Sequence, residues 1–189
     1  MAEALASRSP LGSLDGQRRT HGAHGLRMRE SPAAPMYDLR LPPADSGALR
    51  AARSLFGLDL PLTPCSAHIA GKNRALWSGP DQWLLVCERS VDAAAVIAGG
   101  AVVDVSDLRA IFELEGPRAV DVLRKGCAVD LHPREFGPGR YALTALARVR
   151  AGILQLDTAP RYEIYVERSY AEYLWAWLTD AMMEYGNAR

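Results

Sequence analysis

The stretch that most constrains the fold is residues 104–139, because a strand, a helix and a shaped loop follow one another in it. Apolar and acidic side chains alternate over residues 112–115, which is typical of a half-buried strand. Gly116-Pro117 ends that strand, and proline suits the first turn of a helix because the N–H that it lacks has no partner there. Gly126 stands where a left-handed residue would end the helix. We therefore expect a compact strand–helix unit that leads into a rigid, turn-rich loop over residues 130–139.

An antiparallel meander is expected after that loop. Strand patterns cover residues 141–149, 152–156 and 162–166, with short turns at residues 150–151 and 157–161. Connections of this length join strands as hairpins, so neighbouring strands should run in opposite directions.

The clearest helix pattern lies at the C-terminal end of the chain. Ser169 and Glu172 form an S-x-x-E capping box, and apolar residues then recur at helical spacing as far as Tyr185. Tyr173 and Trp175 lie off this apolar stripe. They are candidates for contact with a partner, because aromatic side chains are enriched at protein interfaces.

The N-terminal half of the chain contains a second helix pattern. Asp45 or Ser46 can cap a helix that runs to Phe56, and Gly57 can end it. Shorter elements are expected around it: strands at residues 36–41, 66–77 (two, around a turn at 71–73), 84–87 and 101–105, and a short helix at 91–97. The strand at residues 101–105 is apolar enough to be buried.

The domain organisation follows from these patterns. Residues 1–35 are rich in Ala, Ser, Gly, Pro and Arg and are expected to be a mostly irregular extension. Residues 36–189 are expected to form one α+β domain of antiparallel sheets with packed helices. If the extension orders against a partner, its leucines and Met28 are the side chains expected to dock, namely Leu11, Leu14 and Leu26 with Met28.

Charge and cysteine content exclude several classes of protein. The 22 basic and 22 acidic residues balance, which argues against a nucleic-acid or anionic-membrane partner. The three cysteines match no zinc or C-x-x-C spacing, so they are expected to be buried thiols in a reducing compartment. The sequence shows no apolar run of the roughly 20 residues that span a bilayer and no signal-peptide pattern, so cytoplasmic residence is expected.

A search for chemistry in the sequence predicts no catalytic, cofactor-binding or metal-binding residue. No G-x-G-x-x-G, P-loop, G-x-S-x-G or clustered metal-ligand pattern occurs. Asp104, Asp107 and Arg109 cluster after a strand, where ion pairing and turn capping explain them better than catalysis does. Asp130 and His132 are either a base with its orienting carboxylate or, as we prefer, part of a turn before Pro133. These patterns favour a binding or structural subunit.

Three runs of the chain carry a family resemblance. They are GPDQWLLV (residues 79–86), VDVSDLRAIFELEGPRAVDVLRKGCAVDLHPREFGPGRYA (residues 103–142) and YEIYVERSYAEYLWAWL (residues 162–178), with a short leading SPL at residues 9–11. The sequence resembles the gamma subunit of heterotetrameric sarcosine oxidase.

The resemblance implies a fold like the folate-binding module of glycine-cleavage aminomethyltransferases. It also implies alpha, beta and delta partner subunits in a complex that oxidises sarcosine to glycine, with hydrogen peroxide and formaldehyde or methylenetetrahydrofolate as the other products. FAD, FMN, NAD and tetrahydrofolate are expected on the two large subunits, zinc on a small one, and no cofactor on this chain.

The folate site itself is not expected here. Aminomethyltransferases place an acidic residue, which contacts the folate pterin, just after a glycine-led strand start. The comparable stretch of this chain runs from Gly152 to Leu156, and Gln155 or Leu156 stands at that position. A glutamine cannot act as a carboxylate base.

The leading hypothesis is therefore a non-catalytic subunit of a flavin-dependent oxidase. The alternatives are a stand-alone folate-binding or one-carbon-transfer protein, or the gamma subunit of an oxidase for another N-methyl amine. The loop at residues 130–139 and the C-terminal helix are expected to contact partners, with Leu131, Phe136, Tyr173 and Trp175 as the contact candidates.

Overall fold

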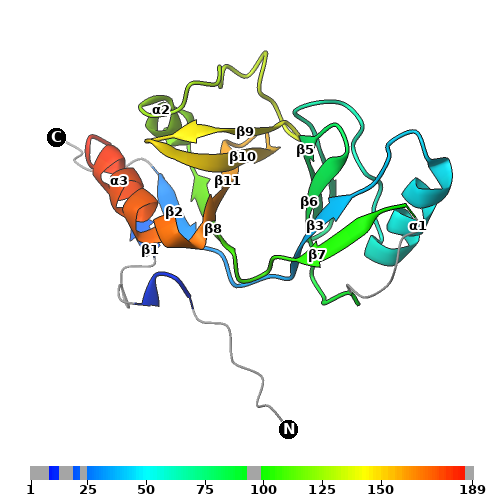
Figure 1. Cartoon of the computed structure of the whole chain (residues 1–189). Helices are drawn as coiled ribbons and strands as arrows, with labels where there is room; N and C mark the ends of the chain where they lie inside the picture. Colours follow the sequence, from blue (N-terminus) through cyan, green and yellow to red (C-terminus); the bar gives the residue numbers. More distant parts are fainter. Residues whose placement is uncertain (1–8, 13–18, 22–24, 93–98, 186–189) are drawn as a thin grey trace, which may run out of the picture.

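Two antiparallel sheets face each other in the computed structural model, which describes residues 9–12, 19–21, 25–92 and 99–185. Figure 1 shows the two sheets side by side with helices on their outer faces. The large sheet has the strand order β1-β2-β8-β11-β10-β9, and the small sheet has the order β4-β5-β6-β3-β7. The α+β class predicted from the sequence is confirmed.

The strands of the large sheet are β1 (Arg19–His21), β2 (Arg27–Glu30), β8 (Arg109–Glu115), β9 (Tyr141–Leu146), β10 (Val149–Asp157) and β11 (Arg161–Glu167). Those of the small sheet are β3 (Met36–Arg40), β4 (Ala67–Ala70), β5 (Asn73–Gly79), β6 (Gln82–Val86) and β7 (Ala101–Asp104). The helices are α1 (Ser46–Phe56), α2 (Ala119–Arg124) and α3 (Ala171–Met183), with a 3-10 turn η2 (Arg168–Tyr170) before α3. None of these helices is long and apolar enough to span a lipid bilayer.

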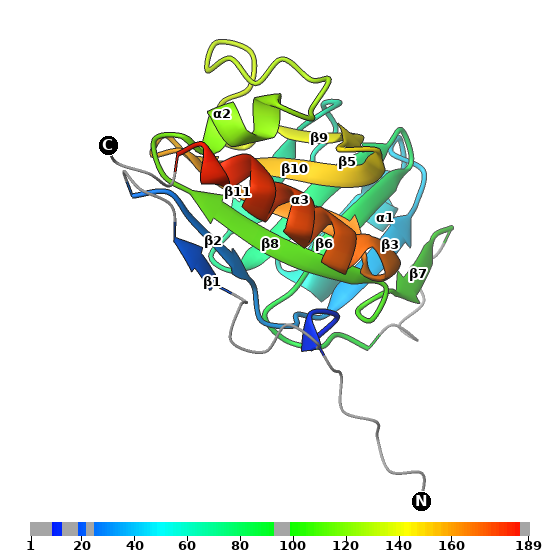
Figure 2. The same ribbon diagram turned by 90° about the vertical axis from the view of Figure 1, so that its left-hand side faces the viewer.

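Three apolar cores hold these layers together. One lies between the large sheet and helices α2 and α3, and Figure 2 shows α3 lying across β8 and β11. A second lies between the small sheet and α1. The third fills the space between the sheets with side chains such as Leu84, Tyr141, Leu154 and Tyr165. Each sheet therefore buries both of its faces over much of its area.

A buried ion pair also joins the two sheets. Arg74 of β5 donates to the Glu163 carboxylate of β11 through Nη2 and Nε, at 3.2 and 3.3 Å. The Tyr165 hydroxyl donates to the same carboxylate. Burial, and after it the Glu163 charge, raise the pKa of Tyr165 well above its ordinary value. This hydrogen-bonded group therefore links a strand of the small sheet directly to a strand of the large one.

Helix α1 forms as its sequence predicts. The Asp45 carboxylate accepts hydrogen bonds from the N–H groups of Gly47 and Ala48, at 2.8 and 3.0 Å. Gly57 ends the helix in the left-handed conformation, with φ of 72°. The helix packs Ala48, Ala52 and Phe56 against the small sheet.

The strand–helix unit of residues 104–139 is confirmed, but two details of its prediction are wrong. Pro117 lies ahead of α2, whose N-cap is Arg118, so the proline is not in the first helical turn. Gly126 does not have a positive φ. It is required by packing instead, since a Cβ atom there would lie 2.6 Å from Cη2 of Trp177 on α3.

The meander of β9, β10 and β11 is confirmed, with its first turn displaced. The turn lies at Ala147-Arg148 and not at residues 150–151. Both residues have positive φ, 51° and 82°, which is the conformation of a tight primed hairpin turn. The predicted capping box is wrong, because α3 begins at Ala171 with no side-chain cap.

The N-terminal segment is more ordered than the sequence indicates. Strand β2 pairs with β8 over Arg27–Glu30, and Leu11, Leu26 and Met28 are buried in the core of the large sheet. They therefore dock against this chain's own sheet. The expected irregular structure before residue 36 is wrong for these residues, because the polar sequence between the leucines hides the strand pattern.

Two smaller predictions also need comment. The strand predicted at residues 101–105 forms as β7, but it is a largely exposed edge strand. The burial predicted from its apolar composition is therefore wrong. The helix predicted at residues 91–97 lies mostly outside the described residues, as does Leu14.

Candidate functional site

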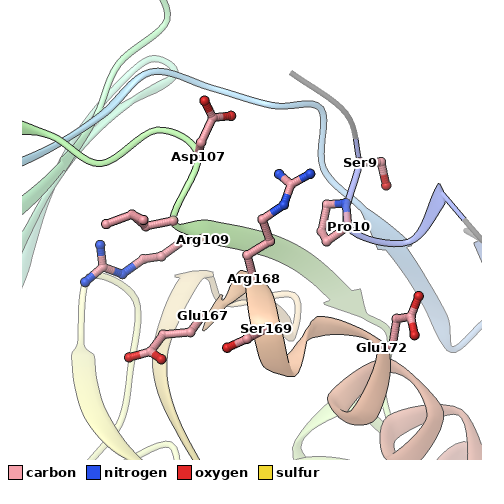
Figure 3. A pocket seen from close by; sticks show the side chains of 9 residues that line it. Ser9, Pro10, Asp107, Arg109, Glu167, Arg168, Ser169 and Glu172 are labelled. Carbon is pink, nitrogen blue, oxygen red and sulfur yellow. The ribbon is translucent and has the colours of Figure 1, made fainter. Parts of the chain in front are cut away.

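A pocket of about 950 Å³ opens on the surface where the N-terminal segment, the β7–β8 loop and η2 meet. Figure 3 shows Ser9 and Pro10 on one side of it and the turn that carries Arg168 and Ser169 on the other. Its lining residues are Ser9, Pro10, Asp107, Leu108, Arg109, Glu167, Arg168, Ser169 and Glu172. Five of these residues are charged, two of them basic and three acidic, so the walls are mixed in charge.

Hydrogen bonds hold the walls of this pocket in place. The Ser9 hydroxyl donates to both carboxylate oxygens of Glu30, at 2.8 and 2.6 Å, and accepts from the N–H of Leu11. The N–H of Arg168 donates to the carbonyl of Leu108 at 2.9 Å. The pocket is thus a fixed surface feature whose mixed charge suits contact with another polar surface.

Two exposed apolar side chains lie in or next to the wall of this pocket. Leu108, which lines it, is 59% exposed, and Tyr170, which follows the lining residue Ser169, is 47% exposed. The sequence did not indicate either, since Tyr170 fits the apolar stripe of the C-terminal helix. The sequence feature that could have indicated the exposure of Leu108 is its position in a polar turn, where a leucine has no local structural role.

Three of the four predicted contact residues are buried in this chain. Leu131, Phe136 and Trp175 are at most 3% exposed and pack in the core of the large sheet, where the Trp175 ring meets Phe112 edge to face. As surface contacts they are wrong predictions. Tyr173 is 45% exposed, and its hydroxyl donates to the carbonyl of Ala147 at 2.7 Å. It stays a candidate contact residue.

The polar groups that had a possible catalytic role are used in turns. Asp104 accepts from the N–H and the hydroxyl of Ser106, at 2.9 and 2.5 Å. Asp130 accepts from the N–H of His132 at 2.8 Å, and Nδ1 of His132 accepts from the N–H of Arg134 at 3.2 Å. These bonds match the turn-capping interpretation of Asp104 and of Asp130 with His132.

The three cysteines are free thiols, and they join no metal-binding group among the residues that the structure describes. Cys65 is exposed, so the expected burial is wrong for this thiol. Burial raises the pKa of Cys87 to about 11. Burial also raises the pKa of Cys127, against a smaller opposing effect of a hydrogen bond to the backbone at Val129. Both thiols are therefore poor nucleophiles at neutral pH.

Gln155 occupies a structural position in β10. Its side chain is 5% exposed, and Nε2 donates to the carbonyl of Asp157 at 3.0 Å. This bond crosses the bulge at which β10 changes register against β11. The Gln155 side chain thus supports the end of its own strand.

Comparison with known proteins places the chain in a family. The family described as sarcosine oxidase, gamma subunit, matches residues 41–184. The sarcosine oxidase subunit gamma of Corynebacterium sp. (strain U-96) is 34% identical over 174 residues, which cover 88% of this chain and 84% of that protein. The subunit gamma of an Arthrobacter species is 32% identical over 194 residues, covering 99% of this chain and 89% of that protein.

Solved structures give the same result at the level of the fold. A chain of the heterotetrameric sarcosine oxidase from Corynebacterium sp. U-96, in complex with pyrrole 2-carboxylate, superposes with a TM-score of 0.84 and 31% identity, over 96% of this chain and 97% of that one. Aminomethyltransferase T of the glycine cleavage system from Bartonella henselae gives a TM-score of 0.61 at 14% identity, over 94% of this chain and 59% of that one, which confirms the expected fold alone. This chain therefore belongs to the sarcosine oxidase gamma subunit family.

Proposed function

We propose that this chain is the gamma subunit of a heterotetrameric sarcosine oxidase and has a structural, non-catalytic role in it. The observation that carries the proposal is the superposition of 96% of the chain on a chain of such an oxidase, at 31% identity. The side chains with possible chemistry add support, because Asp104, Asp130 and Gln155 each hold a local turn or strand end.

The proposal assigns the chemistry to other subunits. The partners would be alpha, beta and delta subunits, which would bind FAD, FMN, NAD, tetrahydrofolate and zinc. The complex would oxidise sarcosine to glycine. This chain would contribute contact surface, and Tyr173, Leu108 and Tyr170 are among its exposed apolar side chains.

Co-expression with the three candidate partners tests the assembly. With an affinity tag on the alpha subunit, this chain is expected to co-purify in equal amount with the other three. Its omission is expected to lower the yield or stability of the complex while the flavin spectrum of the large subunits is retained. Failure to co-purify with either large subunit would refute the proposal.

Activity assays separate the remaining alternatives. Oxygen consumption with sarcosine and with a second N-methyl amine such as dimethylglycine identifies the substrate of the complex. Calorimetry of the isolated chain with tetrahydrofolate tests the folate-binding alternative. Tight binding there would replace the structural role with a ligand-binding one.

A further inference from the structure

A second, smaller cavity lies at one end of the space between the sheets, beyond the apolar core that fills its middle. It has a volume of about 210 Å³ and is lined by strands of both sheets. Arg40 comes from the small sheet, and Arg109 and Arg150 come from the large one. We call it the arginine cleft.

The small-sheet side of the arginine cleft is internally satisfied. Nη2 of Arg40 donates to Oε1 of Gln82 at 2.9 Å, and Nε2 of Gln82 donates to both carboxylate oxygens of Asp38, at 3.0 and 2.8 Å. This chain of bonds occupies the Asp38 carboxylate. It leaves that wall with one cation and one anion held in fixed positions.

The large-sheet side carries an excess of positive charge. Arg109 and Glu167 are direct cross-strand neighbours, and Arg150 also lines the cavity from β10. Nη1 of Arg109 is buried without a hydrogen-bond partner in the described part of the chain. Figure 3 shows the side chains of Arg109 and Glu167 pointing to the same side, away from Ser9 and Pro10. Two guanidinium groups thus stand beside one carboxylate.

A tyrosine hydroxyl completes the arginine cleft. The Tyr141 ring packs on Gly152, where a Cβ atom would lie 2.5 Å from the hydroxyl oxygen, so the glycine makes room for this group. Burial raises the pKa of Tyr141 to about 12, against smaller opposing effects of Arg109, Ser78 and Arg150. The hydroxyl is therefore protonated at neutral pH and can donate a hydrogen bond.

We propose that the arginine cleft binds a small carboxylate, with Arg109 and Arg150 pairing its charge and the Tyr141 hydroxyl as a further donor. Guanidinium groups hold carboxylates through strong charge-assisted bonds, and a buried donor without a partner favours a ligand that supplies an acceptor. The volume holds about seven water molecules at roughly 30 Å³ each, which suits a two- to five-carbon acid. Drug-sized ligands need cavities of about 300 Å³ or more.

Binding of acetate and succinate to the full-length chain tests this proposal. Calorimetry and thermal unfolding are compared with sodium chloride at matched ionic strength, for the natural chain and for Arg109→Gln, Arg150→Gln and the control Arg134→Gln. Arg134 is exposed in the loop after β8 and α2 and does not line the cleft. We expect saturable binding that weakens by about tenfold or more in the two cleft variants, as loss of a charge-assisted bond implies, and is unchanged in Arg134→Gln.

A second variant at Arg109 distinguishes loss of the binding contact from loss of folding. Arg109→Lys keeps the charge but loses the planar fork, so we expect it to fold, as judged by circular dichroism, and to bind more weakly than the natural chain. Equal binding in all variants, or a response that only follows ionic strength, would overturn the proposal. So would the absence of binding up to about 50 mM of either acid, since a specific weak site should saturate below that.

Discussion

Replacement of Gly126 by alanine tests the strongest packing constraint in the chain. The added Cβ atom would lie 2.6 and 2.7 Å from the Trp177 ring and 3.1 Å from the Ala147 nitrogen. That nitrogen donates to the Gly126 carbonyl at 3.0 Å, so the backbone cannot retreat without loss of this bond. The variant should therefore force α3 away from the end of α2.

The expected magnitude follows from two opposing effects. Insertion of a methyl group into a packed site costs about 1–3 kcal/mol. Alanine also has less conformational entropy than glycine in the unfolded chain, which stabilises the folded state by about 0.4–1 kcal/mol. We expect a net loss of about 1–2 kcal/mol in the free energy of unfolding, which lowers the urea midpoint by roughly 0.5 M at a slope of about 3 kcal/mol per molar. Far-UV circular dichroism measures it without relying on tryptophan.

A matched glycine and a double-mutant cycle control the interpretation. Gly137→Ala has 3.7 Å to its nearest neighbour and no positive φ, so it should be neutral or slightly stabilising. Trp177→Phe removes the ring atoms that collide, so Gly126→Ala should cost much less in that background. Equal effects of Gly126→Ala and Gly137→Ala, or the same cost with and without Trp177, would refute the packing argument.

Three further predictions concern charge, pH and partner contact. Glu163→Gln leaves the buried Arg74 charge unmatched and should lower the free energy of unfolding by about 3 kcal/mol or more in urea denaturation. Stability should fall as pH rises from about 9 to about 11, because the buried Cys87 thiol ionises more readily in the unfolded chain than in the folded one; urea midpoints across that range measure it. Tyr173→Phe should cost about 1 kcal/mol through its lost hydrogen bond yet still co-purify with partners, whereas Tyr173→Ala should reduce co-purification.

Each of these three predictions has a control that distinguishes the stated interaction from a general loss of stability. Glu88→Gln breaks an exposed pair with Lys72 and should cost under about 1 kcal/mol, so an equal effect of Glu163→Gln would contradict its buried role. Cys87→Ala should flatten the decline in stability above pH 9, and an unchanged slope would assign that decline to the buried tyrosines. Undiminished co-purification of Tyr173→Ala would remove Tyr173 from the contact surface.

Local signals predicted the elements that local chemistry controls. Asp45 and Gly57 delimit α1 because a carboxylate cap and a left-handed glycine act on their immediate neighbours. The alternation at residues 112–115 identified β8, since its apolar side chains pack in the core beneath the helices while Glu113 and Glu115 pair with arginines of β2. Such signals need no knowledge of the rest of the chain.

The sequence-based predictions are wrong where a segment that is distant in the sequence determines the local structure. Position 126 requires glycine because the side chain of Trp177, which is 51 positions further along the chain, packs directly against it. Leu131 and Phe136 are buried because a turn-rich loop folds back over the large sheet, and no periodicity in a loop reports that. Trp175 lies off the simplest helical stripe but still meets Phe112, because a helix lying across a sheet buries a wider face than a coiled-coil seam does.

The two ends of the space between the sheets differ in a way that joins the structural role to the proposed ligand. At one end, Arg74 and Glu163 satisfy each other across the sheets. At the other, Arg109 and Arg150 line the arginine cleft from the large sheet, and Nη1 of Arg109 has no hydrogen-bond partner in the described part of the chain. A carboxylate bound there would supply the missing contact and favour one orientation of the sheets. Because linkage is reciprocal, a ligand that favours the orientation seen in the assembly would strengthen assembly by the same factor by which assembly strengthens its binding.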